Sequence, residues 1–157
     1  MSAEQFADAG SALFGTLFPD SMVRYKPVFT PAISQYSTLF TRASLVVNNP
    51  FLTALGRPNR ETVSTNRESQ ANLLQALELT NGERFNSMLR KGAENWKLKY
   101  KSGDIIIREV YKQALGREVK ANELKVAKKI VGDKPESGSI EDLFWAVMLL
   151  PEFQIIY

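Results

Sequence analysis

Helix-length stretches with apolar residues at three- and four-residue steps constrain this fold more than any other feature. In the first stretch Phe6, Ala9 and Leu13 share one face, and Pro19 ends it. This spacing is typical of an amphipathic α-helix, which proline cannot continue. The pattern recurs, and we expect helices over residues 2–18, 49–56, 69–79, 83–90, 104–115, 122–131 and 139–150. We therefore predict an all-α fold, a single globular helical domain over 1–157 with about five to seven helices.

Residues near 19–48 do not follow the helical pattern. Pro27 and Pro31 lack backbone donors and prevent a long helix there. We expect a long irregular segment between the first and second strong helices. In the C-terminal half, short loops favour antiparallel neighbouring helices.

Local side chains predict where several of these helices begin and which faces they bury. Ser2 and Ser139 each begin a capping-box pattern, and Asp104 is the expected cap of its helix. In the helix predicted at 69–79, Leu73, Leu74 and Leu77 are expected to face inward. Ala-Leu-Gly-Arg occurs at 54–57 and again at 114–117. We interpret both copies as helix ends, because glycine adopts the left-handed conformation and arginine offsets the negative helix terminus.

The residue types that are missing exclude many chemistries. The chain has no Cys and no His, which excludes disulfides, Cys/His zinc sites, Ser-His-Asp catalysis and covalent haem attachment. We expect no metal, no cofactor and no catalytic residue in this chain, although carboxylate metal sites and lysine chemistry stay formally open. No apolar run approaches the roughly 20 residues of a membrane span, so we expect none.

The basic residues are concentrated in one half of the chain. Between Arg84 and Lys134 there are 14 Lys/Arg and 6 Asp/Glu, which we interpret mainly as solvated helix faces. Within this region Trp96 and Tyr100 alternate with lysines. Such a run can stack on bases or sugars, or it can cover the edge of a core. We favour the second interpretation and expect no nucleic-acid partner.

The segment 57–68 is the strongest candidate for a binding site. Guanidinium groups in such a loop could hold a carboxylate or a sulfate of a ligand. Alternatively, arginine–glutamate pairs could hold the loop against the helices, and this is the interpretation that we favour. The candidate residues are Arg57, Arg60, Glu61, Arg67 and Glu68.

Two sets of motifs resemble a known family. They comprise Leu55-Gly56-Arg57-Pro58-Asn59-Arg60-Glu61-Thr62 with Glu68–Leu73, and Tyr111–Arg117 with Ile140–Ala146. They are similar to domain-of-unknown-function family 1553, the C-terminal part of large planctomycete-type proteins, many of which carry a c-type cytochrome domain. The resemblance implies a periplasmic or extracellular fragment of a larger polypeptide, with haem in an upstream domain. Many relatives carry Cys after the Arg-Glu pair, whereas residues 63–66 contain none.

A second departure concerns the helix at 122–131, which relatives often begin with Thr-Pro. Here Lys120-Ala121 occupies that place, and we expect a ragged first turn.

The sequence thus predicts a non-catalytic interaction or scaffold domain of a larger secreted, cytochrome-linked protein. Its expected partners are other domains of the same polypeptide. Two alternatives stay open. One is a carbohydrate- or sulfate-binding module that uses the loop 57–68, with a polysaccharide as partner. The other is a partial enzyme site that an upstream domain completes.

Overall fold

The computed structural model describes residues 1–15, 24–25, 40–41, 49–58 and 72–155. Most of the predicted irregular segment 19–48 lies outside these ranges. Within it, β1 (Arg24–Tyr25) pairs antiparallel with β2 (Phe40–Thr41). The helices are α1 (Ala3–Phe14), α3 (Pro50–Ala54), α4 (Leu73–Asn81), α5 (Glu83–Lys99), α6 (Gly103–Leu115), α7 (Ala121–Val131), α8 (Ser137–Met148) and α9 (Pro151–Gln154). The predicted all-α fold class is confirmed.

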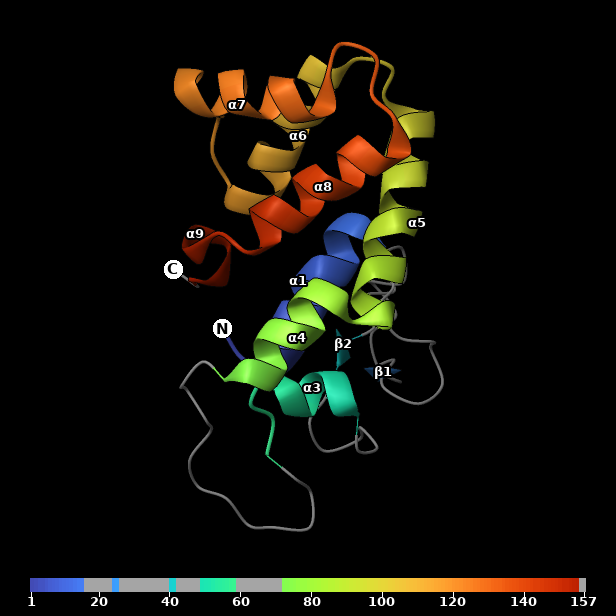
Figure 1. The fold of residues 1–157 in the computed structure, drawn as a ribbon. Helices are drawn as coiled ribbons and strands as arrows, with labels where there is room; N and C mark the ends of the chain where they lie inside the picture. Colours follow the sequence, from blue (N-terminus) through green and yellow to red (C-terminus); the bar gives the residue numbers. More distant parts are fainter. Residues whose placement is uncertain (16–23, 26–39, 42–48, 59–71, 156–157) are drawn as a thin grey trace, which may run out of the picture.

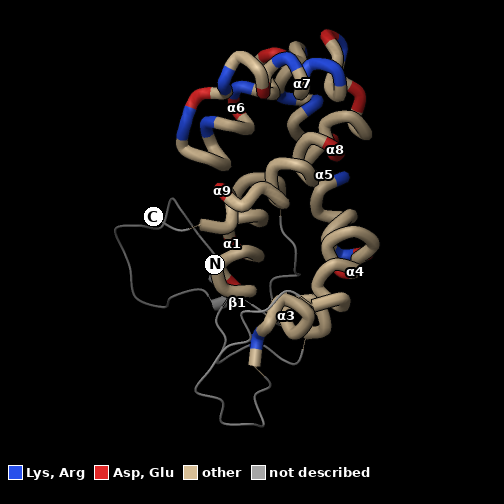
Figure 2. The backbone as a smooth tube through the Cα atoms, turned by 60° about the vertical axis from the view of Figure 1, so that its left-hand side comes forward, with Lys and Arg blue, Asp and Glu red and all other residues tan. Residues whose placement is uncertain are grey.

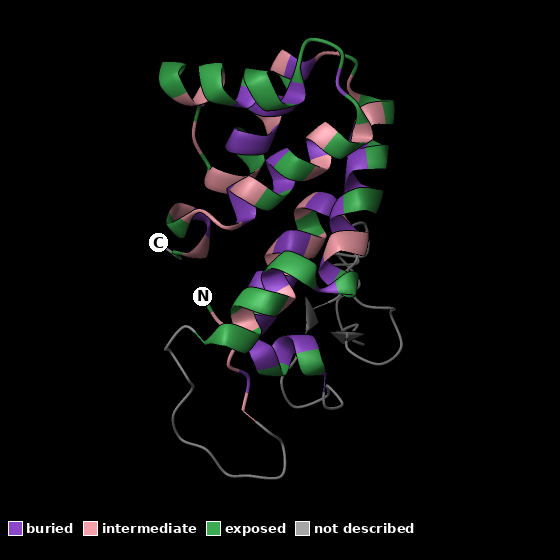
Figure 3. Ribbon diagram, in the orientation of Figure 1, coloured by how far each residue is buried: buried purple, intermediate pink, exposed green. Residues whose placement is uncertain are grey.

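Helix α5, the longest of the described helices, connects two groups of helices (Figure 1). It packs along α8 at one end of the molecule and against α1 and α4 at the other. Helices α6, α7 and α8 contact one another in pairs, while α3 packs on α1 and α4. Figure 3 shows the buried residues on the sides of the helices that face their neighbours.

Aromatic rings fill the centre of this arrangement. The rings of Phe14 on α1 and Phe144 on α8 stack with centroids 4.1 Å apart. Trp96 on α5 meets Phe144 edge to face at 5.3 Å. Farther along, the rings of Phe6 and Phe51 each lie 6.1 Å from that of Phe85. The core therefore continues from α3 through α5 to α8.

Several helix ends agree with the local signals in the sequence. The backbone N–H of Gln5 donates to Oγ of Ser2, and the N–H of Ser2 donates to the Gln5 side chain, so the first capping box is confirmed. Asn49 caps α3 ahead of Pro50. Gly56 and Gly116 have φ of 86° and 66°, as expected where glycine closes a helix.

Two predicted caps are wrong. Helix α6 has Ser102 at its N-cap, and Asp104 instead forms an ion pair with Lys128 at 2.7 Å. Helix α8 begins at Ser137, two residues earlier than predicted. The hydroxyl of Ser139 accepts from the N–H of Glu136 and donates to its carbonyl, so Ser139 acts from the third helical position.

The burial predicted for α4 is also wrong. Leu73, Leu74 and Leu77 are 77%, 53% and 48% exposed, and Leu79 is the residue of this helix that is buried. The predicted start at residue 69 lies outside the described ranges, and α4 begins after Asn72. The C-terminal end of α4 is held because the indole N–H of Trp145 donates to the Leu79 carbonyl at 2.9 Å. Tertiary anchoring at that end decides which leucine is buried.

A close crossing of α1 and α5 depends on Gly92. A Cβ at this position would collide with the backbone carbonyl of Phe14. We expect Gly92→Ala to lower the free energy of unfolding by about 1–3 kcal/mol, because overpacking outweighs the better helix propensity of alanine. Gly138→Ala on α8 is the matched control, since a Cβ there meets open space. Urea unfolding should show no loss for the control, and equal losses in both variants would contradict the steric argument.

Candidate functional site

Of the five residues proposed for the 57–68 site, the structure places Arg57. Arg60, Glu61, Arg67 and Glu68 lie outside the described residues. The Arg57 guanidinium Nε lies 3.7 Å from Oε1 of Glu4, and the two side chains are 3% and 8% exposed. This separation exceeds that of a hydrogen bond, so the attraction between these two atoms is coulombic. The charge of Arg57 is directed into the protein, where Glu4 compensates it.

The sequence reasoning did not identify Glu4 as the partner of Arg57. The sequence does indicate that Glu4 needs a partner. Glu4 lies one position after Ala3 and three before Ala7, and both alanines are on the buried face of α1. An acid on the apolar face of an amphipathic helix requires a compensating charge. The sequence offers no means of choosing which arginine supplies it.

The arginine of the second Ala-Leu-Gly-Arg motif has a different environment. Each of the five N–H donors of Arg117 has an acceptor. Nε and Nη2 donate to Glu152 at 2.6 and 2.8 Å, while Nη1 and Nη2 donate to Glu123 at 2.9 and 2.8 Å. The fifth bond runs from Nη1 to the carbonyl of Glu118 at 3.1 Å. We call Arg117, Glu123 and Glu152 the Arg117 clasp, which joins the α6–α7 turn to α7 and α9.

The Arg117 clasp also affects the start of α7. Lys120 supplies no side-chain cap, but its backbone N–H donates to Oε2 of Glu123 at 2.8 Å. This bond gives the backbone N–H of Lys120 an acceptor and so stabilises the first turn of α7 against fraying. The expected ragged first turn is therefore wrong, because a glutamate held by Arg117 orders it.

The clasp shifts the pKa values of its members and of a neighbour. Hydrogen bonds from Arg117 lower the pKa of Glu123 from 4.5 to about 2 and lower that of Glu152. The same bonds, that of Glu152 first, raise the pKa of Arg117. Burial raises the pKa of Tyr111, whose ring centroid lies 5.4 Å from the guanidinium carbon of Arg117. All three charges of the clasp persist near neutral pH.

The clasp predicts a loss of stability in acid. The pKa of Glu123 is lower in the folded state than its ordinary value of 4.5. Its contribution to the free energy of unfolding is therefore fully present above pH 4.5 and is lost as the pH falls toward about 2. We expect the thermal midpoint of the native chain to fall across this interval, and to fall less in Arg117→Gln. Lys125→Gln is the matched control, because it removes one charge from a residue without an ion pair in the described ranges. An identical acid response in Arg117→Gln and the native chain would refute the role of the clasp.

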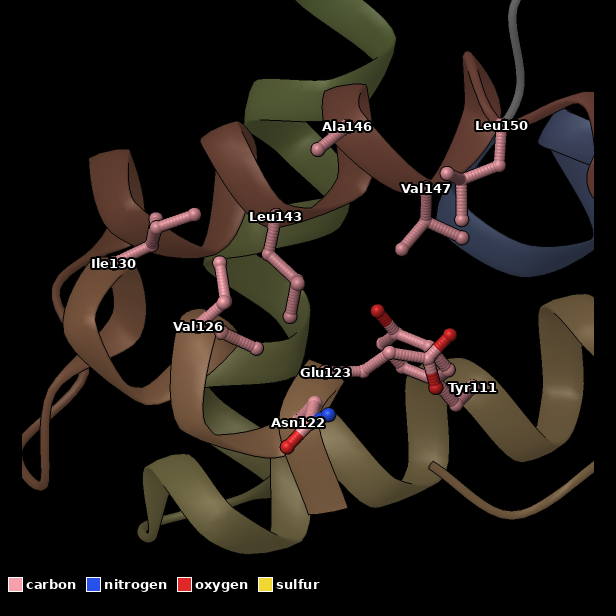
Figure 4. A pocket seen from close by; sticks show the side chains of 10 residues that line it. Tyr111, Asn122, Glu123, Val126, Ile130, Leu143, Ala146, Val147 and Leu150 are labelled. Atoms are coloured by element: carbon pink, nitrogen blue, oxygen red, sulfur yellow. The ribbon is translucent and has the colours of Figure 1, made fainter. Parts of the chain in front are cut away.

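An apolar groove lies beside the clasp, between α7 and α8, with α6 contributing to it. Its volume is about 340 Å³. Figure 4 shows the side chains of the two helices on either side of this space, with Tyr111 and Glu123 at one end. The lining residues are Tyr111, Asn122, Glu123, Val126, Ala127, Ile130, Leu143, Ala146, Val147 and Leu150. We call it the α7–α8 groove.

The walls of the groove are open to solvent while its base is packed. Val126 and Ile130 on α7 are 59% and 41% exposed, whereas Leu143 and Val147 on α8 are buried. Ile130 shares an apolar helix face with Ala127 and Val131, which are buried, so its spacing in the sequence does not show that it is exposed. Glu123 belongs to both the clasp and the groove, so the clasp fixes one end of the groove.

The aromatic and basic run at 96–101 covers the core. Trp96 is buried, and its indole N–H donates to the carbonyl of Leu13 at 3.2 Å. Tyr100 packs against the core and lies 5.3 Å from Trp96 between ring centroids. These rings are engaged inside the protein, in agreement with the interpretation that we favoured.

Two further features are absent from the part of the chain that the structure describes. Among the residues it describes, no group of three or more Asp or Glu side chains could hold a metal ion. Over the same residues, no helix has the length and apolarity needed to cross a bilayer.

Comparisons with known proteins identify a family. Residues 1–131 match the model of a family described as PSD1, protein of unknown function (DUF1553). No curated protein matches the chain, and no solved structure does. The matched residues include α1 to α7, and hence Glu4, Arg57, Arg117 and Glu123, and they end before α8. Because this match covers well over half of its length, the chain belongs to the DUF1553 family.

Proposed function

We propose that this chain is a non-catalytic interaction domain that serves as a scaffold within a larger secreted, cytochrome-linked polypeptide. The α7–α8 groove is the observation that carries the proposal. Its lining is almost wholly apolar, and Val126 and Ile130 in its wall stay substantially exposed. Exposed apolar patches bordered by polar residues are typical of surfaces that bind another protein.

The state of the charged residues supports a non-catalytic role. Glu123 and Glu152 accept hydrogen bonds from Arg117, and both have lowered pKa values. A general acid or base works best with a pKa near the operating pH, so these carboxylates are better suited to holding the structure. Arg57 is likewise directed toward Glu4, which disfavours its use in binding a sulfate or polysaccharide.

The larger polypeptide is inferred from the family resemblance. Haem in such a protein would be attached in another domain, because this chain has no Cys and no His. The reading frame upstream of Met1 tests this part of the proposal. We expect it to encode a signal peptide and a Cys-x-x-Cys-His motif, and an intact gene that starts at Met1 would overturn it.

Binding of the upstream part of the polypeptide tests the interaction role. Hydrogen exchange of this chain should show new protection in α7 and α8 when the purified upstream part is added. Val126→Asp should weaken this binding about tenfold or more, because it places a charge in an apolar contact. Leu98→Asp is the control, since Leu98 is 74% exposed on α5 and does not line the groove. Protection elsewhere, or equal weakening by both variants, would contradict the assignment of the groove.

A further inference from the structure

The shape of the groove and the charges at its rims identify the kind of segment that fits it. We infer that the α7–α8 groove binds an amphipathic α-helix, with acidic residues on the edge beside α7 and a basic residue on the edge beside α8. The inference rests on the proposed function and specifies the partner of that site.

The walls of the groove match the spacing of a helix. Val126 and Ile130 lie four residues apart on α7, and Leu143 and Val147 lie four residues apart on α8. Rows with this spacing form the ridges and grooves through which helices pack together. A helix laid in such a groove inserts side chains at three- and four-residue steps.

The exposure of the walls favours a helix over a small molecule. The volume of about 340 Å³ is at the lower end of the range for ligand pockets, which bury most of the ligand. Here Val126 and Ile130 stay open to solvent along one side, so a small ligand would remain partly in water. A helix with a continuous apolar stripe would cover both of these residues.

The two rims of the groove carry opposite charges. Lys125 and Lys129 are exposed on the outer side of the Val126–Ile130 row, and Asp142 is exposed four residues before Ala146 on α8. None of these three forms an ion pair with another described residue. Figure 2 shows Lys and Arg along α6 and α7, with Asp and Glu between them. A partner with acidic residues on the edge beside α7 and a basic residue on the edge beside α8 would therefore complement these rims.

The carboxylate at the polar end of the groove is already engaged in an ion pair. Both oxygens of Glu123 accept from Arg117, at 2.8 and 2.9 Å. The clasp thus pairs the one carboxylate that lines the groove among the described residues with a guanidinium. The lysines on α7 and the aspartate on α8 are left to determine which edge charges are accepted.

Two synthetic helical peptides of about four turns test the inference. They share a leucine stripe; the first has one acidic and one basic edge, and the second has two basic edges. By fluorescence anisotropy, the native chain should bind the first about tenfold more tightly than the second. The double variant Lys125→Glu, Lys129→Glu makes both rims acidic and should reverse this preference. Ile130→Asp should abolish both interactions, while its thermal unfolding, compared with the native chain, checks that the variant folds.

Each outcome has a distinct meaning. Equal affinity for the two peptides, or an unchanged preference in the lysine variant, would overturn the charge assignment. If neither peptide binds but the upstream part of the polypeptide still protects α7 and α8, the helix inference fails and the proposed function stands. If a peptide binds tightly but the upstream part of the polypeptide does not protect the groove, the proposed function fails and the helix inference stands.

Discussion

Arg57→Ala is expected to lower the free energy of unfolding by about 3–5 kcal/mol, because it removes a buried guanidinium that lies 3.7 Å from the buried carboxylate of Glu4. The side chains of Arg57 and Glu4 are 3% and 8% exposed, so water cannot fully replace the lost guanidinium. Urea unfolding followed by circular dichroism measures the change. The expected loss is large compared with the total stability of a domain of this size, about 5–15 kcal/mol.

The Arg90–Glu141 pair provides a matched control for burial. Its Nε–O distance is also 3.7 Å, but the Arg90 side chain is 67% exposed. Arg90→Ala should therefore cost less than about 1 kcal/mol. The double variant Arg57→Met, Glu4→Leu removes both charges and should recover much of the stability lost in Arg57→Ala. Similar losses for Arg57→Ala and Arg90→Ala would show that the Arg57 pair is not structural, and would revive the ligand-binding interpretation of the loop.

Local sequence signals predicted several helix ends because the interactions responsible span only a few residues, whereas the helix predicted at 83–90 continues to Lys99. The Ser2 capping box and the glycines at 56 and 116 need no knowledge of the rest of the chain. The exposed leucines of α4 show the limit of this reasoning. Periodicity finds an apolar face, but the packing of α4 against α3 and α5 decides how much of that face is covered.

The candidate site was less predictable than the fold. The Arg57–Glu4 pair joins residues far apart in sequence, and the Arg117 clasp gathers Glu123 from α7 and Glu152 from α9. No spacing rule connects these positions. The α7–α8 groove was missed for a related reason, because an apolar residue such as Ile130 has the same pattern in a core and in an open groove.

Phe144→Ala is expected to lower the free energy of unfolding by about 3–5 kcal/mol, since it leaves a cavity where a fully buried ring was. The ring of Phe144 contacts Phe14 on α1 and Trp96 on α5, so its loss loosens three helices together. The neighbouring variant Trp145→Phe removes one hydrogen bond, to the Leu79 carbonyl. It should cost only about 0.5–1.5 kcal/mol.

Phe144→Ala also tests the prediction that residues 1–157 form one domain. Tryptophan fluorescence reports on Trp96, which contacts Phe144 at the centre of the core, and on Trp145 on α8. Far-ultraviolet circular dichroism reports on all the helices. In a single cooperative unit the two signals shift to the same lower urea midpoint. Because α5 packs on both α1 and α8, we expect this coincidence. A fluorescence transition that separates from the loss of helix would show that α6–α8 unfold independently, and that the groove belongs to a separate unit.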